Sequence, residues 1–176
     1  MANWDYDSAK FNELILYIVD RCADDPYFGD THLNKVLFFS DAFALQHLGE
    51  PITGARYQKL EFGPAAVALL PARRELEAAQ DVEVTMDGWR RVTRAMREPD
   101  TDLFTDDELE LVDQVIELVK GKRAKTVSEE SHDNSPGWNL VEEGEDIPLE
   151  SQLISREKPP SEVLERGREL AAKFGW

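Results

Sequence analysis

The stretch Leu33-Asn34-Lys35-Val36-Leu37-Phe38-Phe39-Ser40-Asp41 contains five large apolar side chains in nine residues. It belongs to a segment that begins at Thr31, a residue suited to cap a helix, and ends at Gly49 and Pro51, which stop one. On a helix drawn through this segment, apolar residues cover more than half of the circumference. Such a helix belongs in the middle of a domain or beneath a partner protein.

Helices with a single apolar stripe are predicted on both sides of this segment. In residues Ser8–Cys22 the apolar side chains recur at helical spacing, and Asp7 or Ser8 can cap the first turn. Thr105 and Glu108 have the spacing of a capping box, and a second apolar stripe follows them to Val119. The stripe of residues 8–22 should be buried, and the capping box with its stripe is the strongest single helix signal in the sequence.

Two further helices are predicted nearer the end of the chain. One covers Lys125–His132 and ends before Pro136, and the other begins at Ser161. The acid-rich residues 142–150 between them should form an exposed loop or a short strand.

Extended segments are indicated in two places. Residues Thr53–Phe62 alternate in part between polar and apolar side chains, which favours a short strand. Residues Val82–Thr93 have the pattern of a β-hairpin, with Asp87-Gly88 as the central pair of a type I′ turn.

A third helix is predicted to begin at Gly63-Pro64, because proline is favoured at the first helical position. Pro71 lies inside this helix, so a kink or restart is expected near Leu70. Together these elements predict an α+β fold, mainly helical, with about five to six helices and a small antiparallel β-sheet. No repeat or flexible linker divides the chain, so residues 1–176 should form a single domain, with residues 139–176 as its acidic loop and final helix.

The charge balance restricts the classes of partner. The chain has 20 Lys and Arg residues against 36 Asp and Glu, which gives a net charge of −16. Because proteins bind phosphate backbones through clustered cations, nucleic-acid binding is not expected. The negative field would speed the encounter with a basic partner, although an acidic surface can also serve solubility alone. No segment has the apolar length of a membrane-spanning helix or the pattern of a secretory signal, and the single cysteine fits a reducing compartment, so we expect a cytoplasmic protein.

The sequence lacks the common catalytic and cofactor-binding motifs: the Walker A loop, GxGxxG, GxSxG and HExxH. His32 and His47 are fifteen positions apart rather than four, and Cys22 has aspartates near it that disfavour a reactive thiolate. We therefore expect no metal ion and no cofactor, and a core position for Cys22. The crowding of Ser, His and carboxylates in Ser128–Asp133 favours a capped helix end over catalysis, with a hydrolase using His132 as the lesser alternative.

Several motifs together resemble one family. Leu33–Asp41 (LNKVLFFSD) is similar to the second helix of the Panacea domain, which is found in SocA-like antitoxins and phage-associated GepA-like proteins. Gly49–Gly54 (GEPITG) and Tyr57–Pro64 (YQKLEFGP) resemble the stretch that follows in that family. Ser131–Asp133 and Pro136–Trp138 resemble the SH and W elements of its longer members.

The resemblance covers roughly residues 11–138 and implies an antitoxin of a bacterial or phage toxin–antitoxin system. Such a protein would have no enzymatic activity and would neutralise a toxin encoded nearby by binding it directly. One branch of the family implies an alternative, in which the antitoxin is an adaptor that delivers the toxin to a ClpX-type protease. The sequence leaves open whether the chain also binds copies of itself.

The motifs also nominate residues for contact with the partner. These are Tyr57, Lys59, Glu61, Phe62, Gly63, Pro64, His132 and Trp138. Phe62 departs from the family pattern, because a tyrosine is common before the Gly-Pro pair and phenylalanine lacks its hydroxyl donor. The alternative is that these residues belong to the scaffold. The two interpretations are evenly matched for four of them: Tyr57, Lys59, Glu61 and Trp138.

Overall fold

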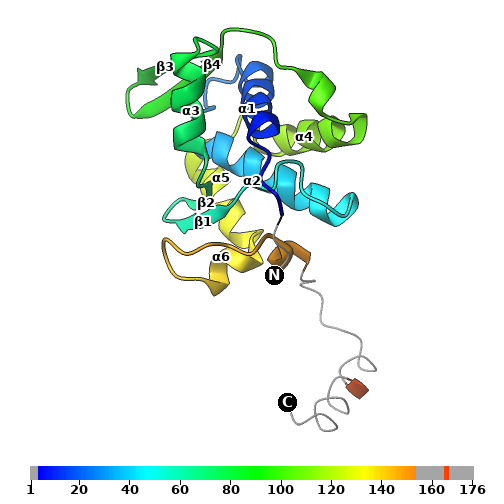
Figure 1. The fold of residues 1–176 in the computed structure, drawn as a ribbon. Helices are drawn as coiled ribbons and strands as arrows, with labels where there is room; N and C mark the ends of the chain where they lie inside the picture. Colours follow the sequence, from blue (N-terminus) through cyan, green and yellow to red (C-terminus); the bar gives the residue numbers. More distant parts are fainter. Residues whose placement is uncertain (1–3, 154–164, 167–176) are drawn as a thin grey trace.

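A helix at the centre of the molecule organises the fold. The structure is a computed structural model that describes residues 4–153 and 165–166. Helix α2 (Asp30–His47) runs through the middle, and the other elements pack around it (Figure 1). Its Leu33, Val36 and Leu37 side chains are buried, which confirms the predicted central helix. Thr31 is not its N-cap, because the helix begins one residue earlier, after Gly29.

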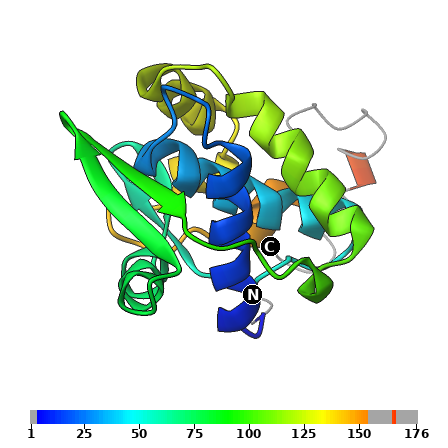
Figure 2. The ribbon, with the colours of Figure 1, turned by 90° about the horizontal axis from the view of Figure 1, so that it is seen from above.

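Two amphipathic helices cover α2. Helix α1 (Ser8–Arg21) has Asp7 as its N-cap, and helix α4 (Asp106–Val119) begins with the predicted capping box of Thr105 and Glu108. Seen from above, α4 and a β-hairpin lie on opposite sides of α1 (Figure 2). A short 3₁₀ turn, η1 (Thr101–Leu103), precedes α4. The periodicity of the apolar residues predicted both helices correctly.

The strands form two separate antiparallel ribbons instead of one sheet. Strand β1 (Tyr57–Leu60) pairs with β2 (Gly63–Ala66), and β3 (Val82–Asp87) pairs with β4 (Arg90–Ala95). Helix α3 (Leu69–Ala78) connects the two ribbons. The fold is therefore α+β and mainly helical, as predicted, with six α-helices in the part of the chain that is described.

The predicted helix start at Gly63-Pro64 is wrong, because these residues open strand β2. Gly63 has a positive φ of 103°, and Pro64 lies opposite Lys59 in the ribbon. Helix α3 begins at Leu69 instead, so Pro71 falls in its first turn, where backbone N–H groups have no partner within the helix. A proline at that place breaks no helical hydrogen bond, and no restart is needed.

The predicted turn of the second hairpin is displaced by one residue. Asp87 pairs with Arg90, so Gly88 and Trp89 are the two residues of the turn. Only Gly88 of this pair has a positive φ, 60°, so the turn is not the predicted type I′, which needs two. The side chain of Trp89 is fully exposed at the tip.

The region after α4 contains more regular structure than predicted. Helix α5 (Ala124–Asp133) confirms the expected short helix, whereas α6 (Pro136–Leu140) and the 3₁₀ turn η2 (Leu149–Leu153) were not expected. Part of the acid-rich segment pairs with β1, since Lys59 N donates to the carbonyl of Glu145 at 2.9 Å. The predicted helix from Ser161 lies outside the described residues, apart from positions 165 and 166, which are helical.

A buried polar network joins α2 to the segment before and within β1. The Asp41 carboxylate accepts hydrogen bonds from Thr53 N at 2.8 Å, Thr53 Oγ1 at 2.6 Å and Tyr57 Oη at 2.8 Å. Burial raises the pKa of the Asp41 carboxyl, while these hydrogen bonds act in the opposite direction. Because a buried carboxylate depends on such partners, the network specifies where the chain meets α2.

We expect Tyr57→Phe to lower the free energy of unfolding by about 1–3 kcal/mol, because it leaves a buried carboxylate short of one donor. Urea denaturation followed by circular dichroism measures this change. Tyr27→Phe is the matched control, because Tyr27 is exposed and should lose less than about 0.5 kcal/mol. Equal stabilities of the two variants would contradict the assigned role of the Asp41 network.

Candidate functional site

The structure brings together motif residues that are far apart in the sequence. The turn between β1 and β2 lies against helices α5 and α6 (Figure 1). Ser128 Oγ on α5 donates to the carbonyl of Phe62 at 3.0 Å, and Trp138 Nε1 on α6 donates to the carbonyl of Leu60 at 3.1 Å. Two helices therefore hold this turn in place through its own backbone.

An aromatic and cationic cluster stands beside this turn. The rings of His132 and Trp138 are stacked, with centroids 3.9 Å apart and planes inclined by 7°. Lys59 Nζ lies 4.3 Å from the centroid of the Trp138 ring and donates to the carbonyl of Val141 at 2.9 Å. Trp138 thus connects the end of α5 to strand β1 through a stacking and a cation–π contact.

His132 is placed for packing rather than for proton transfer to a neighbouring serine. Its Nε2 atom is buried and has no hydrogen-bond partner among the residues that the structure describes. Burial, followed by the charge of Lys35, lowers the pKa of His132, so the imidazole is neutral at pH 7. Ser131 Oγ donates to the carbonyl of Ser128 at 2.7 Å instead of to His132. The described atoms around His132 therefore form no serine–histidine pair of the kind that activates a nucleophile.

A buried lysine lies beneath the β1–β2 turn. Lys35 is 2% exposed, and its Nζ donates to the carbonyl of Pro64 at 3.2 Å. No carboxylate lies within ion-pair distance of Nζ among the described residues, and burial lowers the pKa of Lys35 to about 7. A buried amine without a counter-ion is costly, so Lys35 is a destabilising feature.

The approach of Lys35 to the turn explains why Gly63 is a glycine. A Cβ atom at this position would lie 2.5 Å from Ser131 Oγ and 2.9 Å from Lys35 Cε. The positive φ of 103° also disfavours other residues. The backbone conformation therefore favours glycine at position 63, and a larger residue would also force the Ser131 and Lys35 side chains to move.

The residues nominated from the sequence differ in accessibility. Tyr57, Gly63 and Pro64 are buried, so they offer little surface to a partner. Lys59, His132 and Trp138 are half-buried, whereas Glu61 and Phe62 are exposed. We use the name motif surface for the residues with some exposure around this turn: Lys59, Leu60, Glu61, Phe62, His132 and Trp138. That this surface contacts a partner stays a prediction.

Two contributors to the site were missed in the sequence. Lys35 belongs to the Leu33–Asp41 motif, and a lysine inside an apolar helical segment is itself an unusual signal. Ser128 was seen only as part of a helix end, and its hydrogen bond to the carbonyl of Phe62 has no local signature. Contacts between residues 66 positions apart cannot be read from spacing.

The other candidate residues have structural surroundings. Cys22 is buried, and burial raises the pKa of its thiol to about 12, which confirms the expected core position. His32 is buried, with Nε2 at 2.8 Å from the carbonyl of Lys122. Across residues 4–153 and 165–166, no three His, Cys, Asp or Glu side chains are grouped so that they could hold a metal ion. No helix in the same described part combines the length and hydropathy needed to cross a bilayer.

Comparison with known proteins gives one result. The family model described as "Antitoxin SocA-like, Panacea domain" matches residues 33–139 of this chain. The matched segment begins in α2 and ends in α6. It therefore contains all residues of the motif surface and also the buried Lys35. Searches of curated proteins and of solved structures return no match.

The buried lysine predicts a pH-dependent stability. The unfolded chain keeps the Lys35 proton up to the ordinary pKa of 10.5, whereas the folded chain releases it above about pH 7. Between these values the unfolded state binds more protons, so the contribution of Lys35 to the free energy of unfolding rises with pH. We expect Lys35→Met to be more stable at pH 7, by on the order of a few kcal/mol, and to lack this rise.

Chemical denaturation at pH 7 and pH 9 measures both effects. Lys125→Met is the matched control, because the Lys125 side chain is 87% exposed and should change stability by less than about 0.5 kcal/mol at either pH. A Lys35→Met variant that is less stable than the parent at pH 7 would show that the amine is not buried at a cost.

Proposed function

The chain belongs to the family of SocA-like antitoxins with a Panacea domain, and we propose that it neutralises a cognate toxin by direct protein–protein binding. The family match over residues 33–139 carries this proposal. The proposed action is stoichiometric and non-enzymatic, and the toxin is taken to be encoded by a neighbouring gene. The hydrogen bonds of Ser128 and Ser131 to backbone carbonyls support a binding role for this region rather than a nucleophilic one.

The motif surface is the proposed contact with the toxin. Phe62 is 61% exposed on a turn whose carbonyl groups are held by Ser128 and Trp138. A large aromatic side chain on a rigid turn loses little conformational entropy when it is covered, which is the property of an interface anchor. Glu61 adds a charge beside this anchor, and the net charge of −16 favours a toxin with a basic surface.

Co-expression with the adjacent open reading frame tests the function. We expect the neighbouring gene to stop growth when it is expressed alone, and growth to return when this protein is co-expressed. Purification of a tagged copy should then recover the intact toxin in a stable complex. A neighbour that is harmless alone, or that stays lethal in the presence of this protein, would refute the proposal. If the toxin is instead degraded in a protease-dependent manner, the protein acts as a proteolytic adaptor and not by sequestration.

The contact itself is tested by Phe62→Asp. We expect this variant to lose protection and to bind the toxin more weakly by about 2 kcal/mol or more, because it places a charge where an aromatic anchor is covered. Met96→Asp is the matched control, since Met96 is also 61% exposed and lies after β4, outside the motif surface. Growth assays and calorimetric titration measure the two effects. Equal protection by both variants would show that the toxin does not bind at Phe62 and contacts another surface.

A further inference from the structure

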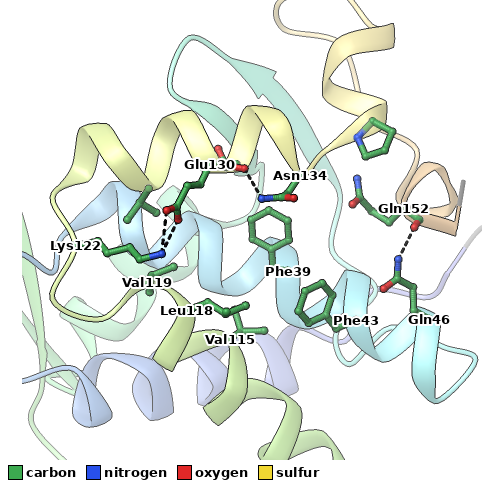
Figure 3. A pocket seen from close by; sticks show the side chains of 13 residues that line it. Phe39, Phe43, Gln46, Val115, Leu118, Val119, Lys122, Glu130, Asn134 and Gln152 are labelled. Atoms are coloured by element: carbon green, nitrogen blue, oxygen red, sulfur yellow. Dashed lines mark hydrogen bonds and ion pairs between the residues drawn. The ribbon is translucent and has the colours of Figure 1, made fainter. Parts of the chain in front are cut away.

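A mainly apolar groove lies along the face of α5 that carries Val127 and Glu130, next to the face that carries His132 of the motif surface. It is bounded by α2, α4, α5 and η2 and has a volume of about 440 Å³. Figure 3 shows the rings of Phe39 and Phe43 from α2 side by side in the groove, with Val115 and Leu118 of α4 next to them. The two ring centroids are 5.9 Å apart. Six of the thirteen residues that line the groove are Phe, Val or Leu, and six others are polar or charged.

The polar residues at the ends of the groove bind one another. Lys122 Nζ forms an ion pair with Glu130 at 2.8 Å, and Asn134 Nδ2 donates to the carbonyl of Glu130 at 2.9 Å. At the other end, Gln46 Nε2 donates to the carbonyl of Gln152 (Figure 3). Because these groups are already satisfied within the chain, the groove offers a ligand mainly apolar contact.

The rim of the groove leaves apolar surface exposed in an acidic environment. Leu118 is 52% exposed, although it lines the groove together with the buried Val115 and Val119. Residues 106–133, which include the two flanking helices, carry nine carboxylates against four Lys and Arg side chains. A partner that covers Leu118 therefore meets an apolar floor surrounded by net negative charge.

We propose that this groove receives the apolar face of an amphipathic helix of the toxin, whose polar face carries lysine and arginine. A channel between two helices over a third accepts large apolar side chains spaced at i, i+3, i+4 and i+7, as in other helix-in-groove complexes. The acidic flanking helices favour basic residues on the opposite face of that helix. This inference rests on the proposed function, because the helix is assigned to the toxin.

One toxin molecule could reach both the groove and the motif surface, since α5 contributes to each. His132 belongs to the motif surface, whereas Glu130 and Asn134 line the groove. The two contacts would thus be made on adjoining sides of a single short helix, Ala124–Asp133.

A synthetic peptide tests the groove without the toxin, so this inference and the proposed function can fail separately. The probe is a helical peptide of leucine and lysine with leucines at i, i+3, i+4 and i+7, and its control has the same composition in scrambled order. Fluorescence anisotropy with the full chain should show the ordered peptide binding about tenfold more tightly than the scrambled one. Equal affinities would overturn the inference, because charge alone would then explain binding.

Two leucine variants locate the binding site. Leu118→Glu should weaken binding of the ordered peptide by about tenfold, even though it adds a negative charge that attracts lysine. Leu103→Glu is the matched control, since Leu103 is an exposed leucine on η1 and its replacement should leave the affinity unchanged. Circular dichroism verifies that both variants are folded. Equal affinities of the two variants for the peptide would overturn the inference.

Two further results would assign the groove to another occupant and would also overturn the inference. Peptide binding that appears only when the protein is diluted would show that a second copy of the chain fills the groove. Peptide binding that appears only in a Phe174→Glu variant of the full chain would show that the chain's own C-terminal segment fills it.

Discussion

The structure depends on three polar side chains through which the central helix α2 binds the segment that follows it, residues 53–66. Asn34 Oδ1 accepts a hydrogen bond from Ala66 N at 3.0 Å, Lys35 donates to the carbonyl of Pro64, and Asp41 accepts from Thr53 and Tyr57. Lys35 and Asp41 are buried and Asn34 is half-buried, and each of these side chains has a hydrogen-bond partner among residues 53–66. The β1–β2 ribbon is consequently joined to α2 at two levels of the helix, by Asn34 and Lys35 and, nearly two turns later, by Asp41.

The same constraint connects stability with the proposed binding role. Among the described residues Lys35 is buried without a counter-ion, and a Cβ atom at position 63 would lie 2.9 Å from its Cε beneath the turn. The turn that results is supported from below by α2 and from the side by α5 and α6, while Phe62 points its ring to the surface. A rigid turn with an exposed aromatic residue suits recognition of another protein, since little entropy is lost on binding.

Helix α5 links the two surfaces proposed for the partner. Its Ser128 and His132 support the turn and the stack on Trp138, and its Glu130 and Asn134 border the apolar groove. The sequence of α5 predicted the end of a helix with crowded polar residues. The structure agrees, because α5 ends at Asp133 with Asn134 as its C-cap residue. What those polar residues do depends on the elements that pack against each side of this short helix.

The sequence by itself determined the elements whose signals are local: the stripes of α1 and α4, the Thr105 capping box, the apolar α2 and the motifs of the family. The local sequence does not decide the structure at Gly63-Pro64, because proline suits both the start of a helix and the edge of a ribbon. The pairing of Pro64 with Lys59 and the hydrogen bond from Ala66 N to Asn34 select the ribbon. Only the tertiary structure decided that Leu60 and Trp138, 78 positions apart, form one site. Side-chain contacts over such separations arise from packing around α2, and residue spacing carries no record of them.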